Sequence, residues 1–165
     1  MPPGFPWGWI TAIPLLAFPA GLRAERQYRR LAQLPESVIP GGLPSLSIIV
    51  PARNEQRNLQ ALLPSLLNLE YPGRLEILVV DDHSTDHTAG VAESYGLHVL
   101  RLEGGLPTGW SGKPNACYQG ALQAQGEWFL FTDADPLHPP SGPARAVSFA
   151  IEKGRDGLSL FFRQK

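Results

Sequence analysis

From residue 46 onward, short apolar runs alternate with longer stretches in which leucine and alanine recur at helical spacing. A run of four to eight apolar residues bounded by turn residues is typical of a strand buried on both faces, whereas apolar residues three and four apart indicate a helix packed on one side. The pattern therefore predicts strands at 46–52, 75–82, 97–102 and 127–135, with helices between them at 58–69, 84–96 and 113–126.

Strands that alternate with helices predict an α/β fold. The crossover connections should be right-handed, and the sheet mainly parallel with helices on both faces. For the second helix, Ser84 or Thr85 is the predicted N-cap and Gly96 the predicted end. Because ligands of such sheets bind beyond the carboxyl ends of the strands, the polar residues that follow the first, second and fourth strands become the candidate site.

The N-terminal segment has a different pattern. Residues 5–22 carry no charge, and residues 23–30 then contain four arginines. This pattern predicts a membrane anchor, although the run is slightly shorter than the ~20 residues of a spanning helix and contains three prolines. An interfacial segment and an apolar helix packed on the domain are the alternatives. If the segment spans, the arginines place the domain at the cytoplasmic face of the membrane, and otherwise we expect a cytoplasmic protein.

Three regions follow from these patterns: the N-terminal segment at 1–34, a linker at 35–45 with three prolines and two glycines, and a folded domain at 46–165. The net charge of −1 offers no basic excess for a nucleic-acid partner. Cys117 is the single cysteine, so the chain forms no internal disulfide and a reducing compartment fits best.

The stretch "TDADPLHPP" places Asp133 and Asp135 two residues apart at the end of the fourth strand. An extended backbone can direct one carboxylate to a metal ion and the other to a neighbouring hydroxyl. Hard oxygen ligands suit Mg²⁺ or Mn²⁺, which usually keep waters and bind substrate phosphates as well. The pair therefore predicts a metal–diphosphate site, and an exposed acidic turn is the alternative.

The stretch "DDHSTDHT" at 81–88 allows two interpretations. A transition-metal site would use His83 and His87, but only if both lay on one helix face. In the favoured interpretation, Asp82 accepts hydrogen bonds from a nucleobase edge, Asp86 complements the dipole in the first helical turn, and both histidines lie on the surface.

The stretch "GWSGKPNACYQGA" contains a candidate diphosphate clamp. Gly109 and Gly112 permit an unusual backbone path, Lys113 supplies a cation, and the helix that follows offers N–H groups to phosphate oxygens. The spacing is not that of a P-loop. An ordinary solvated lysine is the alternative for Lys113.

Taken together, "SIIVPARNE", "VVDDHSTDHT" and "FTDADPLHPP" resemble the family-2 glycosyltransferases, which have a GT-A fold, over about residues 46–163. With the clamp and the apolar N-terminus, the chain looks most like the membrane-associated branch that includes hopanoid and carotenoid glycosyltransferases. The resemblance implies transfer of a sugar from a nucleotide-diphosphate donor, with a UDP-sugar favoured, to an acceptor hydroxyl, with inversion and with Mn²⁺ or Mg²⁺. A lipid is the candidate acceptor.

The resemblance also implies roles for individual residues. Asp82 meets the base, Asp133 holds the ribose and Asp135 holds the divalent ion, whereas the role of Lys113 rests on the charge argument above. The nucleotide pocket is further lined by Pro51, Arg53 and Glu55.

The chain departs from the family pattern near its end, where no "ED" pair and no "QxxRW" motif occurs. The expectation is a GT-A domain that is incomplete at its C-terminus, with the catalytic base carboxylate beyond residue 165 and no catalytic residue assigned. A non-catalytic nucleotide-sugar-binding fragment is therefore an alternative. A sugar nucleotidyltransferase is another, but "PARNE" lacks the Gly-rich loop that such enzymes carry after the first strand.

Overall fold

The structure, a computed structural model, describes residue 34 and residues 42–160. Its contacts divide the chain into two units, Met1–Leu34 and Pro35–Lys165. The predicted membrane anchor and most of the predicted linker lie outside the described residues, so both stay predictions. Among the residues that are described, no helix has the length and apolar character needed to cross a bilayer.

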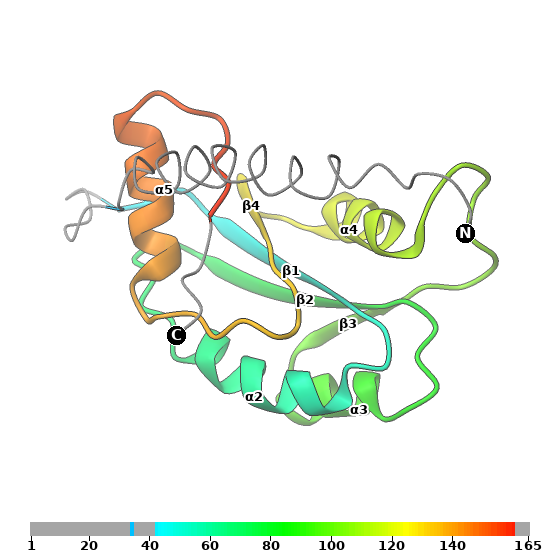
Figure 1. The fold of residues 1–165 in the computed structure, drawn as a ribbon. Helices are drawn as coiled ribbons and strands as arrows, with labels where there is room; N and C mark the ends of the chain where they lie inside the picture. Colours follow the sequence, from blue (N-terminus) through cyan, green and yellow to red (C-terminus); the bar gives the residue numbers. More distant parts are fainter. Residues whose placement is uncertain (1–33, 35–41, 161–165) are drawn as a thin grey trace, which may run out of the picture. The chain divides into compact units, whose positions relative to one another are not determined.

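The second unit is built on a parallel sheet of four strands in the order β3-β2-β1-β4 (Figure 1). The first strand has the limits that its apolar run predicts, and the fourth is shorter than predicted because the chain leaves the sheet before the two aspartates. The strands are β1 (Leu46–Ala52), β2 (Leu75–Asp81), β3 (His98–Arg101) and β4 (Trp128–Phe131).

Both faces of the sheet carry helices, and the central strands are buried as predicted. Successive residues of β1 point to opposite sides: Ile48 and Val50 enter one apolar core, and Ile49 enters another. The larger core lies against α2 (Gln56–Leu67), α3 (Thr88–Ser94) and α5 (Gly142–Glu152), and the smaller one against α4 (Gly112–Gln123) (Figure 1). The predicted α/β fold with helices on both faces is therefore confirmed.

Helix α4 lies unusually close to the sheet. A Cβ atom at Gly120 would lie 2.6 Å from Ile49 Cγ2 and 2.9 Å from Val80 Cγ2, closer than real Cβ contacts come. Only glycine fits at this point, and the close contact fixes the distance between α4 and the strands that carry the candidate site.

Helix α3 begins later than the sequence predicts. It starts at Thr88 with His87 as N-cap, so the prediction of Ser84 or Thr85 was wrong. Ser84 Oγ instead accepts the N–H of Asn54 at 3.0 Å, and the Thr85 N–H donates to Asn54 Oδ1 at 2.8 Å. The prediction failed because both residues find their partners in the loop after β1, about thirty positions away.

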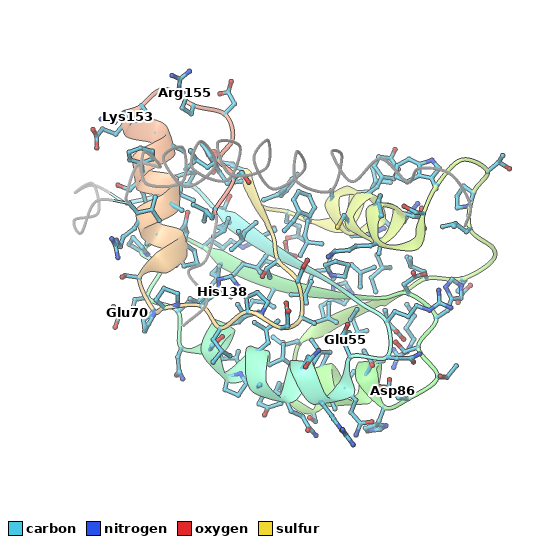
Figure 2. All side chains as sticks on the ribbon, viewed as in Figure 1. Glu55, Glu70, Asp86, His138, Lys153 and Arg155 are labelled. Carbon is cyan, nitrogen blue, oxygen red and sulfur yellow. The ribbon has the colours of Figure 1, made fainter. Side chains whose placement is uncertain are left out.

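Asp86 lies two residues before α3, so its predicted place in the first helical turn was also wrong. Its carboxylate accepts the N–H groups of Thr88 at 3.0 Å and of Gln56, the first residue of α2, at 3.3 Å (Figure 2). These bonds, with that from the Thr88 hydroxyl as the largest contribution, lower the pKa of Asp86. One carboxylate thus stabilises the starts of two helices.

Candidate functional site

The candidate site lies at the carboxyl ends of the strands. The chain winds from β1 to β2 and β3 on one side and returns to place β4 on the other side of β1. In open parallel sheets, the loops on either side of such a reversal separate and leave a crevice that binds ligands. Here the loop after β1 and the loop after β4 border the crevice.

A pocket of about 370 Å³ occupies this position. This volume lies within the range of small-molecule sites. The pocket brings together all seven residues that the sequence singled out, namely Pro51, Arg53, Glu55, Asp82, Lys113, Asp133 and Asp135. Gly112, which the sequence predicted as part of the clamp backbone, also lines the pocket. Four lining residues were missed: Ala52, Asn58, Ala116 and Ala134. Ala52 and Ala134 are sequence neighbours of predicted residues, whereas Asn58 and Ala116 reach the pocket only because their helices begin at its edge.

Asp82 lies in the floor of the pocket. Its backbone N–H donates to the Ala52 carbonyl at 2.8 Å, which extends the pairing of β1 and β2 by one residue. The residue is only 7% exposed. On the far side of its carboxylate, a Cβ at Gly112 would lie 2.5 Å from Oδ2, so the start of α4 can approach Asp82 only because residue 112 is glycine.

Asp133 and Asp135 follow β4 with their side chains exposed, while Ala134 between them is buried. The backbone bends at Ala134 and Asp135, so the prediction that the strand and its extended backbone continue through both aspartates was wrong. Lys113 Nζ, from the first turn of α4, lies 2.5 Å from Asp133 Oδ1, and the two side chains are 59% and 58% exposed. Such an exposed ion pair contributes at most about 1 kcal/mol, so a bound anion can compete with Asp133 for the lysine.

His138, which is labelled in Figure 2, connects the loop that carries the two aspartates to the end of β4 and to α2. Its Nε2 lies 2.8 Å from Thr132 Oγ1, and its backbone N–H donates to Ser65 Oγ of α2 at 3.3 Å. Burial lowers the pKa of His138, so the ring is neutral at neutral pH. The sequence analysis missed this role, although the histidine stands within the quoted "TDADPLHPP".

The pocket has an excess of negative charge. Its lining includes two cations, Arg53 and Lys113, and four carboxylates. No group of three or more His, Cys, Asp or Glu side chains among the described residues could hold a metal ion by itself. Two carboxylates that face one pocket do fit Mg²⁺ or Mn²⁺, because these ions commonly take one or two protein carboxylates and complete their shell with water and substrate phosphates.

A second cavity, of about 600 Å³, adjoins the first and shares Arg53, Asp82 and Gly112 with it. The loop after β3 and helix α4 form most of its remaining walls, with Asn115 and Gln119 contributed by the helix. Asp82 therefore borders two connected spaces, one beside the acidic loop after β4 and one beside the loop after β3.

His83 and His87 do not face one another. His83 Nδ1 lies 2.9 Å from Asp82 Oδ1, and its Nε2 lies 2.8 Å from the Gly104 carbonyl. The ring of His87 instead lies against Gly90 in α3. The hydrogen bond to Asp82, followed by that to Gly104, raises the pKa of His83.

Comparison with known proteins identifies relatives of this chain. Residues 47–164 match the family described as Glycosyl transferase family 2. The 4,4'-diaponeurosporenoate glycosyltransferase of Staphylococcus aureus (strain bovine RF122 / ET3-1) is 39% identical over 108 residues, which make up 66% of this chain. The chain spans only 28% of the length of that relative.

Solved structures with the same architecture include two captured with nucleotide sugars. Mannosyltransferase PcManGT from Pyrobaculum calidifontis, in complex with GDP-Man and Mn²⁺, has a TM-score of 0.62 and 27% identity, with 85% of this chain and 42% of that chain covered. S. aureus TarS 1-349 in complex with UDP-GlcNAc has a TM-score of 0.53 and 32% identity, with 66% and 31% covered.

These matches confirm the family resemblance and the fold that the three motifs predicted. The family match extends over most of the chain and includes every residue that lines the first pocket. The chain belongs to glycosyl transferase family 2 and carries part of a GT-A fold.

Proposed function

We propose that this chain binds the nucleotide-diphosphate sugar donor of a glycosyltransferase that transfers the sugar to an acceptor hydroxyl, with inversion. The observation that carries the proposal is the convergence of all seven predicted residues on one pocket. The related structures solved with GDP-Man and with UDP-GlcNAc support a donor of this class.

The charges of the pocket support a divalent cation in the site. A diphosphate is itself an anion, so four carboxylates and two cations would repel it unless a metal ion offset the excess. We assign Asp135 to Mn²⁺ or Mg²⁺ and Asp133 to the ribose. The structures of related enzymes solved with Mn²⁺ support the use of a divalent cation.

The remaining roles follow from position. Lys113 and Arg53 would bind diphosphate oxygens, and the weak pair between Lys113 and Asp133 would open when the donor enters. Asp82 would accept from the base, which the adjoining cavity has room to hold. Glu55 and Pro51 would complete the wall of the nucleotide pocket.

These residues would act on the leaving group. When bound, the divalent ion supplies a Lewis acid that stabilises the charge on the departing diphosphate. Lys113 and Arg53 would add fixed positive charge beside the same oxygens, which stabilises the transition state because that charge grows as the glycosidic bond breaks.

A lipid is the proposed acceptor, and a UDP-sugar the favoured donor. The relative named for 4,4'-diaponeurosporenoate supports an apolar acceptor. An apolar acceptor would also fit a chain that is held at the cytoplasmic face of a membrane through residues 5–22.

Thermal unfolding with UDP, GDP and ADP, each with and without Mn²⁺, tests the proposal. Binding to the native state raises the melting temperature by mass action, and we expect the largest shift for UDP with Mn²⁺. Asp135→Ala should remove the Mn²⁺-dependent part of the shift. The control is Asp156→Ala, which removes an exposed carboxylate outside the pocket. An equal shift without metal would contradict the role of Asp135, and the absence of any shift with all three nucleotides would contradict donor binding.

A further inference from the structure

The imidazole of His83 joins the floor of the nucleotide pocket to the loop after β3. The residue has a φ of 59°, in the left-handed region that only a few non-glycine residues adopt. This backbone path turns the ring back over the preceding residue, so that Nδ1 meets Asp82 Oδ1 and Nε2 meets the Gly104 carbonyl.

Both partners of the ring are hydrogen-bond acceptors. A carbonyl oxygen only accepts, and so does an ionised carboxylate, whereas a neutral imidazole has a single N–H to donate. Both contacts are therefore satisfied at once only by the imidazolium, which carries a proton on each nitrogen. A neutral ring would place a nitrogen lone pair opposite the oxygen of either Asp82 or Gly104, and that contact would not be a hydrogen bond.

The surrounding charges are mixed. The Asp82 carboxylate favours the cation, and Arg53 from the loop after β1 disfavours it. Arg101 and Glu103, which precede Gly104 along the chain, line the same cavity with opposite charges. The net effect is a raised pKa for His83, with the bond to Asp82 as the largest cause.

The Asp82 carboxylate has a neighbour at each of its two oxygens. One carboxylate oxygen faces His83, and the other faces the start of α4, where the missing side chain of Gly112 leaves it just enough room. The carboxylate is thus held between the His83 ring and the start of α4. If the ring turned away, the carboxylate could rotate out of line with a bound base.

We propose that His83, in its protonated form, is a positioning residue that holds the Asp82 carboxylate in the orientation needed to bind the nucleotide. This role rests on the proposed function of the pocket. It predicts that nucleotide affinity declines as the pH rises and His83 loses its proton.

Isothermal titration of UDP with Mn²⁺ at pH values from 5.5 to 8.5 tests the role. The variant His83→Asn keeps a residue that tolerates the left-handed backbone but cannot become charged. The phosphates of the nucleotide titrate in the same pH range, and this affects binding to every variant equally. The quantity to compare is therefore the dissociation constant of His83→Asn divided by that of wild type at each pH. A pKa of His83 that is higher in the nucleotide-bound state than in the free state makes this ratio depend on pH. We expect the advantage of wild type over His83→Asn to be largest at pH 5.5 and to shrink by about threefold or more by pH 8.5.

The control is His87→Asn, four residues along the same segment, where asparagine suits the N-cap position and the ring does not line either cavity. This variant should keep the wild-type pH profile. A constant ratio between wild type and His83→Asn would overturn the positioning role while leaving donor binding intact. Loss of UDP binding in all three proteins at every pH would overturn the proposed function, and this role with it.

A second measurement reads the ring directly. In the free protein, ¹⁵N spectra of the histidine side chains should show His83 with a proton on both nitrogens at pH 6.5, and His83→Asn identifies the signal. A single neutral tautomer of His83 at that pH would overturn the inference, because a neutral ring cannot donate to both Asp82 and Gly104.

Discussion

Replacing Gly112 by alanine is the sharpest test of the pocket, because it alters the position of Asp82 without removing a functional group. A Cβ at residue 112 would lie 2.5 Å from Asp82 Oδ2, and real Cβ atoms essentially never come closer than 3.0 Å to another atom. The carboxylate must therefore retreat by about 0.5 Å, the difference between these two distances. The backbone of residue 112 is ordinary helix, so alanine causes no strain there.

Two effects of the substitution act on different quantities. Alanine is a better helix former than glycine by about 0.5–1 kcal/mol in a helix interior and by less at the first position, so the free energy of unfolding should stay the same or rise slightly. The displaced carboxylate loses its alignment with a bound base. A hydrogen bond to a charged group is worth about 1.5–3 kcal/mol, which corresponds to a loss of roughly one to two orders of magnitude in affinity.

Isothermal titration of UDP with Mn²⁺, paired with urea unfolding, measures both quantities on the same protein. Gly157→Ala is the matched control, because a Cβ there meets no atom within 4 Å and the residue lies outside the nucleotide pocket. We expect it to bind as wild type does. A Gly112→Ala protein with wild-type affinity for UDP would refute the argument that nucleotide binding depends on the position of the Asp82 carboxylate. A Gly112→Ala protein that is strongly destabilised would show that the clash acts on the fold instead.

Three further predictions concern the stability of the fold and follow from the burial of individual residues. Gly120→Ala should lower the free energy of unfolding by about 1–3 kcal/mol in urea, because its Cβ overlaps Ile49 and Val80; stability equal to that of Gly157→Ala would contradict this packing. Leu62→Ala, at a fully buried site of α2, should cost about 2–5 kcal/mol by the same measurement, and a loss below 1 kcal/mol would contradict its place in the core. Burial lowers the pKa of His138 from the 6.5 of the unfolded chain, so the unfolded state binds a proton first and stability should fall as the pH drops below about 6.5. Melting temperatures between pH 5 and 7.5 should show a flatter profile for His138→Gln, and parallel profiles would exclude this linkage.

The strands were predictable because their chemistry is local. Ile48, Ile49 and Val50 are consecutive apolar residues in β1, a pattern typical of a strand covered on both faces, and the structure gives this strand the predicted limits. The helix limits were less predictable. Ser84 and Thr85 are good N-caps by type, but Asn54 binds both of them, and such a partner cannot be identified from residues 84–96 alone.

The candidate site was predictable to the extent that the carboxyl ends of parallel strands meet at one edge. From the sequence alone, that rule predicts that Asp82, Asp133 and Asp135 lie together. It could not reveal how the side chains pair. The contact of His83 with both Asp82 and Gly104 requires a left-handed backbone at a histidine, which has no sequence pattern of its own.

The two sides of the pocket should differ in how easily they unfold locally, because one side follows β1 and the other follows β4. Strand β4 has only four residues, forms one edge of the described sheet, and exposes Phe129 and Phe131. Short edge segments with few buried contacts fray at a lower free energy than central strands do. Asp133 and Asp135 follow a segment that should open more readily than the central strand β1 does. A donor that spans the crevice would therefore also hold the two sides of the pocket together, and amide exchange in β4 should slow more than in β1 once nucleotide is added.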